Sequence, residues 1–385
     1  MELQTIKFIK ENDNWKDLLI QPPYSLIIKE DSHFYLLKYN QLESDFSNEI
    51  VKECRGLIID KNTLEPVALS FKKFWEVENE LADDIDWNSA KVQEKLDGSK
   101  LLCFYNKYDS EWQVATSGNL NIDEVNVNDF GMTFGQLFNK AVYNNGFKMR
   151  KEFFDLLDKN YCYTFELIAP ENRVVVKYKT ADLYLIGIRN VNTFEEVPTN
   201  QDKNITKYIK VPKEYSLSNL EDCLKATEQM TYNEEGYVVV DKNWHRIKVK
   251  SPAWKEVSKI RGDGVLTKKK IINIIESGLI KETLEFYPEW EEYINKVKRE
   301  LIRFKHMVFI AIYDVLDYME ENNLYIDNNA QMGEIAKYIK EIHPLYQSFI
   351  FKYIKMDKVS EFINNEWSKL TINKKIEYLK VVEND

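Results

Sequence analysis

Histidine and cysteine are scarce in this chain, with four of each among 385 residues. Neither type shows the spacing of metal ligands or of paired disulfide cysteines, so we expect no zinc site, no histidine-based metal centre and no disulfide framework. So few histidines also argue against a Ser-His-Asp site. The scattered cysteines fit a reducing compartment instead.

Long apolar runs are missing as well. No stretch approaches the ~18 apolar residues that indicate a membrane-spanning helix. Residues 1–15 are mixed and charged, unlike a signal peptide. We therefore expect a cytoplasmic protein with no membrane partner.

The sequence also lacks an excess of positive charge. Its 53 Lys and Arg are outnumbered by 63 Asp and Glu, which gives a formal net charge of −10. Proteins that bind nucleic acid through a broad surface are usually basic, so a nucleic-acid partner would need a local basic groove here. The motif G-x-x-x-x-G-K-[ST] does not occur, which excludes a P-loop nucleotide site.

The apolar pattern divides the chain in two. Up to about residue 250, runs of β-branched and aromatic residues predict a buried antiparallel sheet. After Ser251 these runs stop, and a 3.6-residue periodicity predicts helices. We therefore expect an α+β protein, with an antiparallel-sheet domain over residues 1–255 and an all-helical domain over residues 256–385.

The expected strands are residues 34–39, 56–59, 67–71, 112–116, 161–168, 174–176, 183–188, 237–240 and 245–250, besides strands on both sides of residues 94–99. Helices are expected at residues 133–142, 150–158, 330–342, 344–355 and 358–367. A further short helix is capped by Thr267 and ended by Gly278. A long helix after Pro288 shows an apolar stripe made of Trp290, Ile294, Val297, Leu301, Phe304, Val308 and Tyr313.

The hexapeptide Glu94-Lys95-Leu96-Asp97-Gly98-Ser99 carries the strongest local signal. Asp-Gly marks a tight turn, because Gly accepts positive φ and Asp bonds the local backbone. A strand, a turn and a second strand would hold the Lys95 amine over the Gly98 backbone, where it could attack a phosphorus atom. By itself the motif is equally compatible with an ordinary hairpin that carries a solvated lysine.

Several cations stand near the ends of expected strands. Arg55, in Glu53-Cys54-Arg55-Gly56, has a guanidinium that can bind two phosphate oxygens. Lys248 and Lys250 alternate along a strand and so share one face, where two ammonium groups repel each other unless an anion lies between them. Alternatively, these cations form surface ion pairs, or the lysine side chains extend along apolar surface with their amines in solvent.

Lys73 and Trp75 share one strand face on either side of Phe74, which we expect in the core. Glu166 lies inside an apolar strand and needs a partner there, such as a ribose hydroxyl, a metal or a lysine. Glu235 precedes Gly236 at the start of a valine-rich strand and could bind Mg²⁺, which favours one or two carboxylates plus phosphate oxygens. Solvent-facing acids are the alternative for both glutamates.

The order of these motifs resembles that of the bacteriophage RNA ligase 1 family, nucleotidyltransferases that form a covalent lysyl-AMP. The resemblance covers roughly residues 30–255. It rests on the following motifs: E-C-R-G at 53–56, K-F-W at 73–75, E-K-L-D-G-S at 94–99, F-E-L-I-A-P-E-N-R at 165–173, E-G-Y-V at 235–238 and K-V-K-S at 248–251.

The resemblance implies an ATP-dependent RNA ligase that joins 5′-phosphate and 3′-hydroxyl RNA ends, in the repair of tRNA or similar RNA. Lys95 would attack the α-phosphorus of ATP, with Mg²⁺ (or Mn²⁺) as cofactor, and AMP would then pass to the RNA 5′-phosphate. Cationic neighbours, Lys248 and Lys250, would favour the neutral amine. We expect a monomer in the cytoplasm, that of the host cell if a phage encodes the chain.

The resemblance also implies roles for individual residues. Lys95 with Asp97 and Gly98 would form the catalytic turn, and Glu235, together with Glu166, would bind the metal. The expected ATP and phosphate ligands are Tyr39, Arg55, Lys73, Trp75, Glu94, Glu166, Lys248 and Lys250. Arg173, Gly236 and Trp254 belong to the same motifs, and Trp254 replaces a family tyrosine, so that hydroxyl is lost.

Two other readings stay open at this point. The chain could be another enzyme that forms lysyl-AMP or lysyl-GMP, such as a DNA ligase or a capping enzyme. It could also be a non-catalytic RNA-binding protein on the same scaffold. The helical domain is expected to favour particular RNA substrates, but its basic residues are equally compatible with a solvated helix face.

Overall fold

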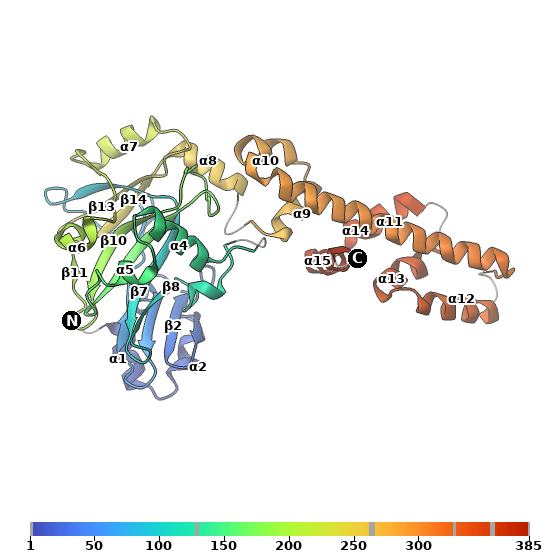
Figure 1. Cartoon of the computed structure of the whole chain (residues 1–385), viewed down its shortest axis with the longest axis horizontal. Coiled ribbons are helices and arrows are strands. Elements are labelled where there is room, and N and C mark those ends of the chain that lie inside the picture. Colours follow the sequence, from blue (N-terminus) through green and yellow to red (C-terminus); the bar gives the residue numbers. More distant parts are fainter. Residues whose placement is uncertain (1–2, 128–130, 262–265, 326–328, 355–358, 384–385) are drawn as a thin grey trace. The chain divides into compact units, whose positions relative to one another are not determined.

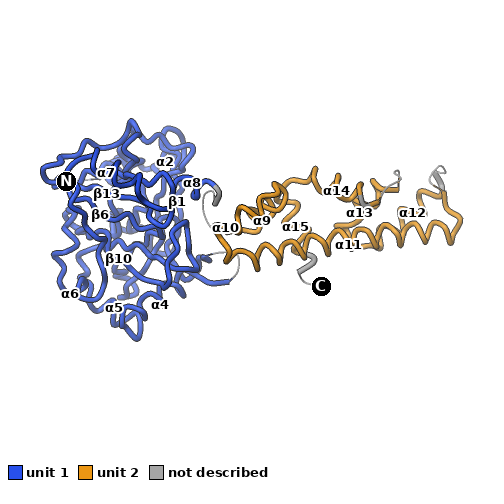
Figure 2. The backbone as a smooth tube through the Cα atoms, turned by 90° about the horizontal axis from the view of Figure 1, so that it is seen from above, with its two compact units in different colours: residues 1–265 blue, residues 266–385 orange. Residues whose placement is uncertain are grey.

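The computed structural model describes residues 3–127, 131–261, 266–325, 329–354 and 359–383. The chain forms two compact units, residues 1–265 and 266–385 (Figure 2). Unit 1 contains the strands, and the described part of unit 2 is helical. The predicted α+β fold, with antiparallel sheets followed by a helical C-terminal region, is therefore confirmed. Helix α8 (Pro252–Arg261) belongs to unit 1.

The described strands of unit 1 form three sheets (Figure 1). The first has the order β1-β2-β3-β4, with β1 (Leu26–Glu30), β2 (Phe34–Tyr39), β3 (Arg55–Asp60) and β4 (Pro66–Ala68). The second has the order β11-β10-β9-β7-β8, with β7 (Ser99–Asn106), β8 (Glu111–Thr116), β9 (Tyr161–Ile168), β10 (Asp182–Asn190) and β11 (Glu196–Val197). The third has the order β12-β6-β13-β14-β5, with β5 (Trp75–Glu76), β6 (Lys91–Glu94), β12 (Glu214–Tyr215), β13 (Gly236–Val240) and β14 (Arg246–Lys250). Pairing is antiparallel except between β5 and β14.

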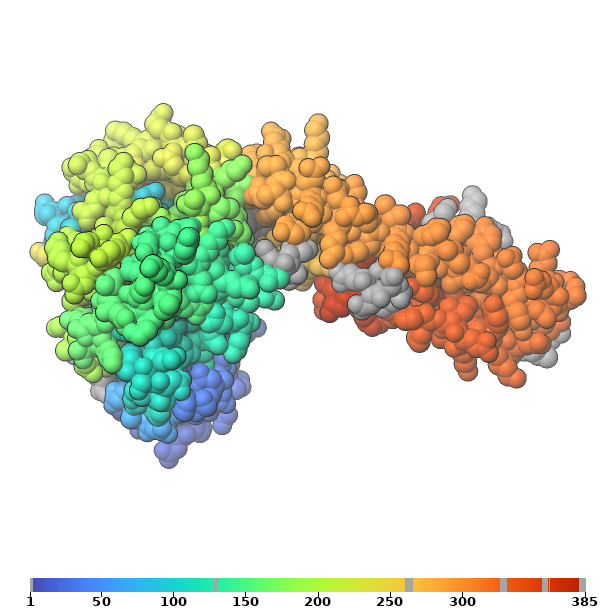
Figure 3. Space-filling view, in the orientation of Figure 1, coloured from blue at the N-terminus to red at the C-terminus, as the bar shows by residue number. Residues whose placement is uncertain are grey.

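Helices cover the outer faces of these sheets. In unit 1 they are α1 (Gln4–Glu11), α2 (Trp15–Leu19), α3 (Glu49–Glu53), α4 (Phe134–Asn144), α5 (Arg150–Phe154), α6 (Lys203–Thr206), α7 (Leu220–Glu228) and α8. A capping box between Thr133 and Gln136 fixes the start of α4. In Figure 3 the green segments that include α4 and α5 cover the centre of the visible face of unit 1.

Alternation along the strands supplies two apolar faces per sheet. In β7, Leu101 and Cys103 face the core under α4, whereas Leu102 and Phe104 face the first sheet. Ile58 of β3 meets them from the other side. The first two sheets therefore pack against each other and are covered by helices on their outer faces.

Some predicted strands and helices differ from the structure. Residues 174–176 form no strand, because the N–H groups of Val175 and Val176 donate to the Asp97 carboxylate instead of to a neighbouring strand. The strand predicted at 67–71 ends at Ala68, and the helix predicted at 150–158 ends at Phe154. The predicted pairing of residues 112–116 with the strand after the turn is confirmed in β7 and β8.

Unit 2 packs around one long helix. Its helices are α9 (Lys268–Glu276), α10 (Ile280–Phe286), α11 (Glu291–Glu321), α12 (Asn329–Glu341), α13 (Pro344–Tyr353), α14 (Val359–Lys369) and α15 (Ile372–Glu383). The Thr267 hydroxyl accepts from Lys270 N and caps α9, as predicted. The predicted stripe of α11 is buried at Ile294, Val297, Phe304 and Val308, but Tyr313 is exposed. Ile312 and Val315 continue the buried face instead, as a 3.6-residue period requires. No helix among the described residues is long and apolar enough to cross a membrane.

Candidate active site

The turn that carries Lys95 joins two different sheets. Strand β6 ends at Glu94 in the third sheet, and β7 begins at Ser99 in the second. The predicted order of strand, turn and strand is present, but the alternative of an ordinary hairpin does not form, because the strands on either side of the turn pair with other strands and not with each other. Lys95 N donates to Gly236 O at 2.9 Å, which fixes the lysine beside β13.

Asp97 and Gly98 fasten this turn to the rest of unit 1. Asp97 Oδ2 accepts from Val175 N and Val176 N, both at 2.7 Å, and so does not cap its own turn. Gly98 does not adopt positive φ; glycine is required because a Cβ there would lie 2.4 Å from Leu167 O. The Gly98 N–H donates to Glu166 Oε1 at 3.1 Å.

Lys95 forms a buried ion pair. Its Nζ lies 2.8 Å from Glu235 Oε2, and the two side chains are 19% and 5% exposed. Burial alone would lower the pKa of the Lys95 amine, but the carboxylates of Glu235, Glu166 and Asp97 outweigh it and raise that pKa. The carboxylates thus favour the charged form of the amine, and the expected effect of Lys248 and Lys250 towards the neutral form stays a prediction for the ATP-bound site.

Glu166 stands in β9 beside the turn. Burial raises the pKa of this carboxyl group to about 7, although the Lys95 ammonium opposes the shift. Burial raises the pKa of Glu235 as well. Burial thus disfavours the ionised form of both carboxyl groups, and an added cation would favour that form.

Arg55 reaches the site from β3. Its guanidinium carbon lies 5.0 Å from the centre of the Phe71 ring and 5.2 Å from that of Phe74. Arg55 Nη1 is buried and has no hydrogen-bond partner in the described part of the chain. A buried N–H without an acceptor is costly, so this group fits an anion that enters the pocket.

Lys248 and Lys250 project from one face of β14, as predicted, but into different surroundings. Lys248 Nζ lies 4.9 Å from the Phe74 ring. Burial, and then the charges of Lys95 and Arg55, lower the pKa of the Lys248 amine to about 7. Lys250 Nζ lies 3.1 Å from Glu76 and 3.9 Å from Glu235, so carboxylates compensate its charge.

Lys73 lies in an aromatic cage. Its Nζ is 4.4 Å from the ring centre of Tyr39, 3.8 Å from Phe46 and 5.7 Å from Trp75. The amine also donates to Gln41 Oε1 at 3.0 Å. Burial and the charge of Arg55 lower the pKa of Lys73 to about 8. The structure thus places three predicted residues, Tyr39, Lys73 and Trp75, together.

The remaining predicted residues lie in different parts of unit 1, either within the lining of the Lys95 pocket or outside it. Glu94 lines the Lys95 pocket, and burial raises its pKa. Gly236 has φ 132° and lies where a Cβ would meet Val249 O at 2.1 Å. Trp254 is buried in α8, with Lys250 Nζ 4.6 Å from its ring. Arg173 is buried away from the pocket lining, where its Nε donates to Val175 O and shapes the loop that holds Asp97.

Sequence reasoning missed two basic residues of the Lys95 pocket, Lys100 and Arg246. Lys100 Nζ donates to the Arg55 carbonyl at 2.8 Å, and burial holds the pKa of Lys100 well below its usual range. The guanidinium of Arg246 lies 4.8 Å from the Phe71 ring, which therefore lies close to both Arg246 and Arg55. The available signals were Lys100 at the start of an apolar strand and Arg246 two residues before Lys248.

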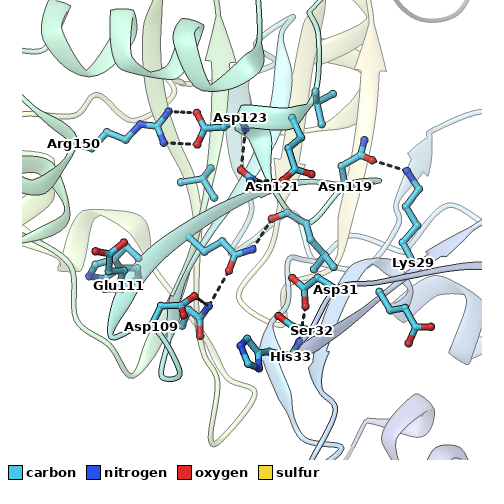
Figure 4. Close-up of a pocket in the computed structure, with 18 residues that line it drawn as sticks. Lys29, Asp31, Ser32, His33, Asp109, Glu111, Asn119, Asn121, Asp123 and Arg150 are labelled. Atoms are coloured by element: carbon cyan, nitrogen blue, oxygen red, sulfur yellow. Dashed lines mark hydrogen bonds and ion pairs between the residues drawn. The ribbon is translucent and has the colours of Figure 1, made fainter.

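The Lys95 pocket is narrow. It encloses about 80 Å³, well below the roughly 300 Å³ at which ligand pockets begin. A larger pocket of about 530 Å³ lies elsewhere in unit 1 and contains none of the predicted residues (Figure 4). There Arg150 donates to both carboxylate oxygens of Asp123, and Lys29 donates to Asn119. These bonds join α5 to the turn at residues 122–124, and β1 to the loop after β8.

Comparison with known proteins gives a match to a family model described as RNA ligase over residues 53–254. The "Putative bifunctional polynucleotide kinase/RNA ligase" of Autographa californica nuclear polyhedrosis virus is 27% identical over 277 residues, which are 68% of this chain and 38% of that protein. The chain thus spans well under half of that relative. An RNA ligase of Rhodothermus phage RM378 is 24% identical over 331 residues, 71% of this chain and 74% of the phage protein.

Among solved structures, an archaeal ATP-dependent RNA ligase matches 77% of this chain and 78% of its own, with 14% identity and a TM-score of 0.44. Among the described residues, no group of three or more His, Cys, Asp or Glu side chains is arranged to hold a metal ion by itself. The family model covers more than half of the 385 residues, including Arg55, Lys95 and Lys250. By that match the chain belongs to the RNA ligase family, and its predicted resemblance to the bacteriophage RNA ligase 1 type is confirmed.

Proposed function

We propose that this chain is an ATP-dependent RNA ligase that joins a 5′-phosphate RNA end to a 3′-hydroxyl end. The observation that carries the proposal is the surroundings of Lys95. This amine is buried against Glu235 and Glu166, and the same pocket is lined by Arg55, whose Nη1 has no acceptor in the described structure. A phosphate group supplies both the electrophile and the missing acceptor.

In the first step, the Lys95 ammonium would give one proton to Glu235 Oε2, which lies 2.8 Å away and belongs to a carboxyl group whose pKa burial raises. The neutral amine would then attack the α-phosphorus of ATP. A P–N bond forms, the bond to pyrophosphate breaks, and the second amine proton passes to the departing pyrophosphate or to water. Arg55, Lys73 and Lys248 would hold the phosphates where negative charge develops.

In the second step, an oxygen of the RNA 5′-phosphate would attack the phosphorus of lysyl-AMP. The P–N bond breaks, and Lys95 regains a proton as it leaves. In the third step, an RNA 3′-hydroxyl would attack the activated 5′-phosphate, lose its proton and expel AMP. The narrow pocket at Lys95 means that nucleotide entry would require lining side chains to move.

A divalent cation fits this site because two buried carboxylates, Glu166 and Glu235, carry raised pKa values. Glu235, together with Glu166, would hold the ion, and phosphate oxygens would complete its ligands, as Mg²⁺ and Mn²⁺ favour. When bound, the ion would offset negative charge on the phosphates. Glu94, Trp75 and Tyr39 would contact other parts of ATP, and Asp97 and Gly98 would hold the Lys95 turn.

We assign these steps to unit 1 and the selection of the RNA substrate to unit 2. We also propose that the protein acts as a monomer in the repair of tRNA or related RNA. Unit 1 contains every proposed ATP ligand. The proposal extends to the cytoplasm, because the four cysteines are free thiols, as in a reducing compartment.

Incubation with ATP labelled in its α-phosphate, plus Mg²⁺, tests the proposal. The chain should acquire label that survives acid, and Lys95→Ala should acquire none. Lys91→Ala is the matched control, because Lys91 begins the same strand but is exposed and paired with Glu214. Label on Lys95→Ala equal to that on the parent would refute the assignment.

Substrate choice separates the competing readings. Circularised 5′-phosphorylated single-stranded RNA with ATP supports the RNA ligase. Sealing only of nicked DNA, or labelling only by GTP, would indicate a DNA ligase or a capping enzyme. Absence of label with any nucleotide, together with RNA binding, would indicate a non-catalytic binder.

A further inference from the structure

A groove of about 880 Å³ opens beside the Lys95 pocket within unit 1. Phe74 and Arg246 line both spaces, so the groove adjoins the candidate active site. Lys73 and Trp75 lie on its inner side. None of the steps proposed above uses the outer part of this groove.

Two aromatic residues of the groove have an unusual backbone. Among the described residues, the aromatic side chains at positive φ are Phe194, at 62°, and Trp244, at 67°. Both line the groove. Positive φ is a genuine outlier for bulky residues, and it persists only where surrounding contacts enforce it.

One ion-pair network contacts the backbone of both residues. Arg189 Nε donates to Phe194 O at 3.0 Å, and Arg246 Nη1 donates to Trp244 O at 3.4 Å. The two arginines share Glu196, which lies 3.6 Å from Arg189 and 2.6 Å from Arg246. The indole of Trp244 is half-buried, with the Arg246 guanidinium 5.4 Å from its ring centre.

The chemistry of the lining indicates the ligand. Base stacking on an aromatic face, with a cation nearby, is how proteins hold single-stranded nucleic acid. The lining carries as many carboxylates as lysines and arginines, so it does not suit a long phosphate backbone. Arg246 is a cation at the end of the groove that adjoins the Lys95 pocket, and Lys73 is a further cation of the groove lining.

We propose that this groove binds the terminal nucleotides of a single-stranded RNA end. One base would stack on the Trp244 ring, and Phe194 would contact the opposite side of that base. The proposal rests on the proposed ligase function and adds the place from which the RNA end reaches Lys95. Binding would depend on stacking more than on charge, and its affinity should therefore fall only slightly with added salt.

The experiment measures the anisotropy of a short, labelled, 5′-phosphorylated single-stranded RNA titrated with the full chain. Trp244→Asn should weaken binding about tenfold or more, because a stacked base contributes strongly to affinity. Trp244→Phe should keep most of the affinity. Tyr143→Ala, which removes an exposed aromatic ring from α4 outside the groove, is the control and should bind as the parent does.

Thermal unfolding separates a binding role from a structural one. Asn tolerates positive φ, so Trp244→Asn should unfold at the same temperature as the parent or higher, while its RNA affinity falls. An RNA affinity of Trp244→Asn equal to that of the parent would refute the proposal that the groove binds RNA. A loss of affinity that parallels a loss of thermal stability would refute it as well. Labelling of Lys95 by ATP, scored in the same samples, reports on the ligase proposal separately.

Discussion

Lys95 Nζ and Glu235 Oε2 lie 2.8 Å apart, although 140 positions separate the two residues in the chain. Both side chains are largely buried, and the next cation near Glu235 is Lys250 at 3.9 Å. This pair places a proton acceptor directly on the proposed nucleophile. It also makes each partner's charge depend on the other, which leads to the first prediction.

Removal of Lys95 should destabilise unit 1 in a pH-dependent way. Lys95→Met leaves the Glu235 carboxylate buried without its nearest cation, which costs about 3 kcal/mol. Burial already raises the pKa of Glu235, so the loss should be largest near pH 8 and should shrink as the carboxyl group takes up a proton towards about pH 5.

Denaturant unfolding of the parent, of Lys95→Met and of Lys95→Met with Glu235→Gln measures this effect. The double variant should recover most of the stability at the higher pH, because it leaves no uncompensated charge. Equal destabilisation of Lys95→Met at both pH values would contradict the buried ion pair.

The Lys248 amine should take up a proton when pyrophosphate binds. The pKa of this amine is lowered to about 7 by burial and neighbouring cations, so it is mostly neutral near pH 8. A bound anion favours the charged form and should raise that pKa, with uptake of about one proton. Calorimetry in buffers of different ionisation enthalpy measures the uptake.

Lys248→Met is the test of this assignment. It should reduce the proton uptake, and the remainder should come from Lys73, whose pKa is lowered to about 8. Lys91→Met, on an exposed part of the same sheet, should leave the uptake unchanged. Proton release on binding, in place of uptake, would rule out this explanation.

Replacement of Arg55 should lower the activity of the protein without lowering its stability. Its Nη1 is buried without a partner in the described structure, so Arg55→Met removes an unsatisfied donor and should unfold no earlier than the parent. The rate of lysyl-AMP formation should fall by about 100-fold or more, which is the usual effect of removing one preorganised hydrogen-bond donor from an active site. Thermal unfolding and a time course of ATP labelling measure both. Large losses in both would assign Arg55 to folding alone.

Gly98 should tolerate no side chain. A Cβ at this position would lie 2.4 Å from Leu167 O, so Gly98→Ala must displace the turn and should cost about 1–3 kcal/mol. Lys95 should label more slowly in this variant, because the same turn holds it. Gly333→Ala, in α12 with no atom within 4 Å of the added Cβ, should be neutral or slightly stabilising. Parent-like melting of Gly98→Ala would contradict the close approach.

Local chemistry in the sequence was enough to predict several features correctly. Thr267 capped a helix as its hydroxyl predicted, and the runs at 112–116 and 161–168 became strands because β-branched and aromatic residues fit a buried sheet. The ordered motifs around Lys95 were enough to indicate the RNA ligase family. Each of these features depends on residues close together in the chain, or on motif identity.

Only the tertiary structure decided which distant groups meet. It placed β6 and β7 in different sheets, bound Val175 and Val176 to Asp97, and brought Arg246 and Lys100 to the Lys95 pocket. It also brought Glu235, Glu166 and Asp97 to Lys95 and so set the direction of its pKa shift, because a pKa depends on burial and on the nearest charges in space. Those distances are set by packing between strands far apart in sequence, which a local pattern does not encode.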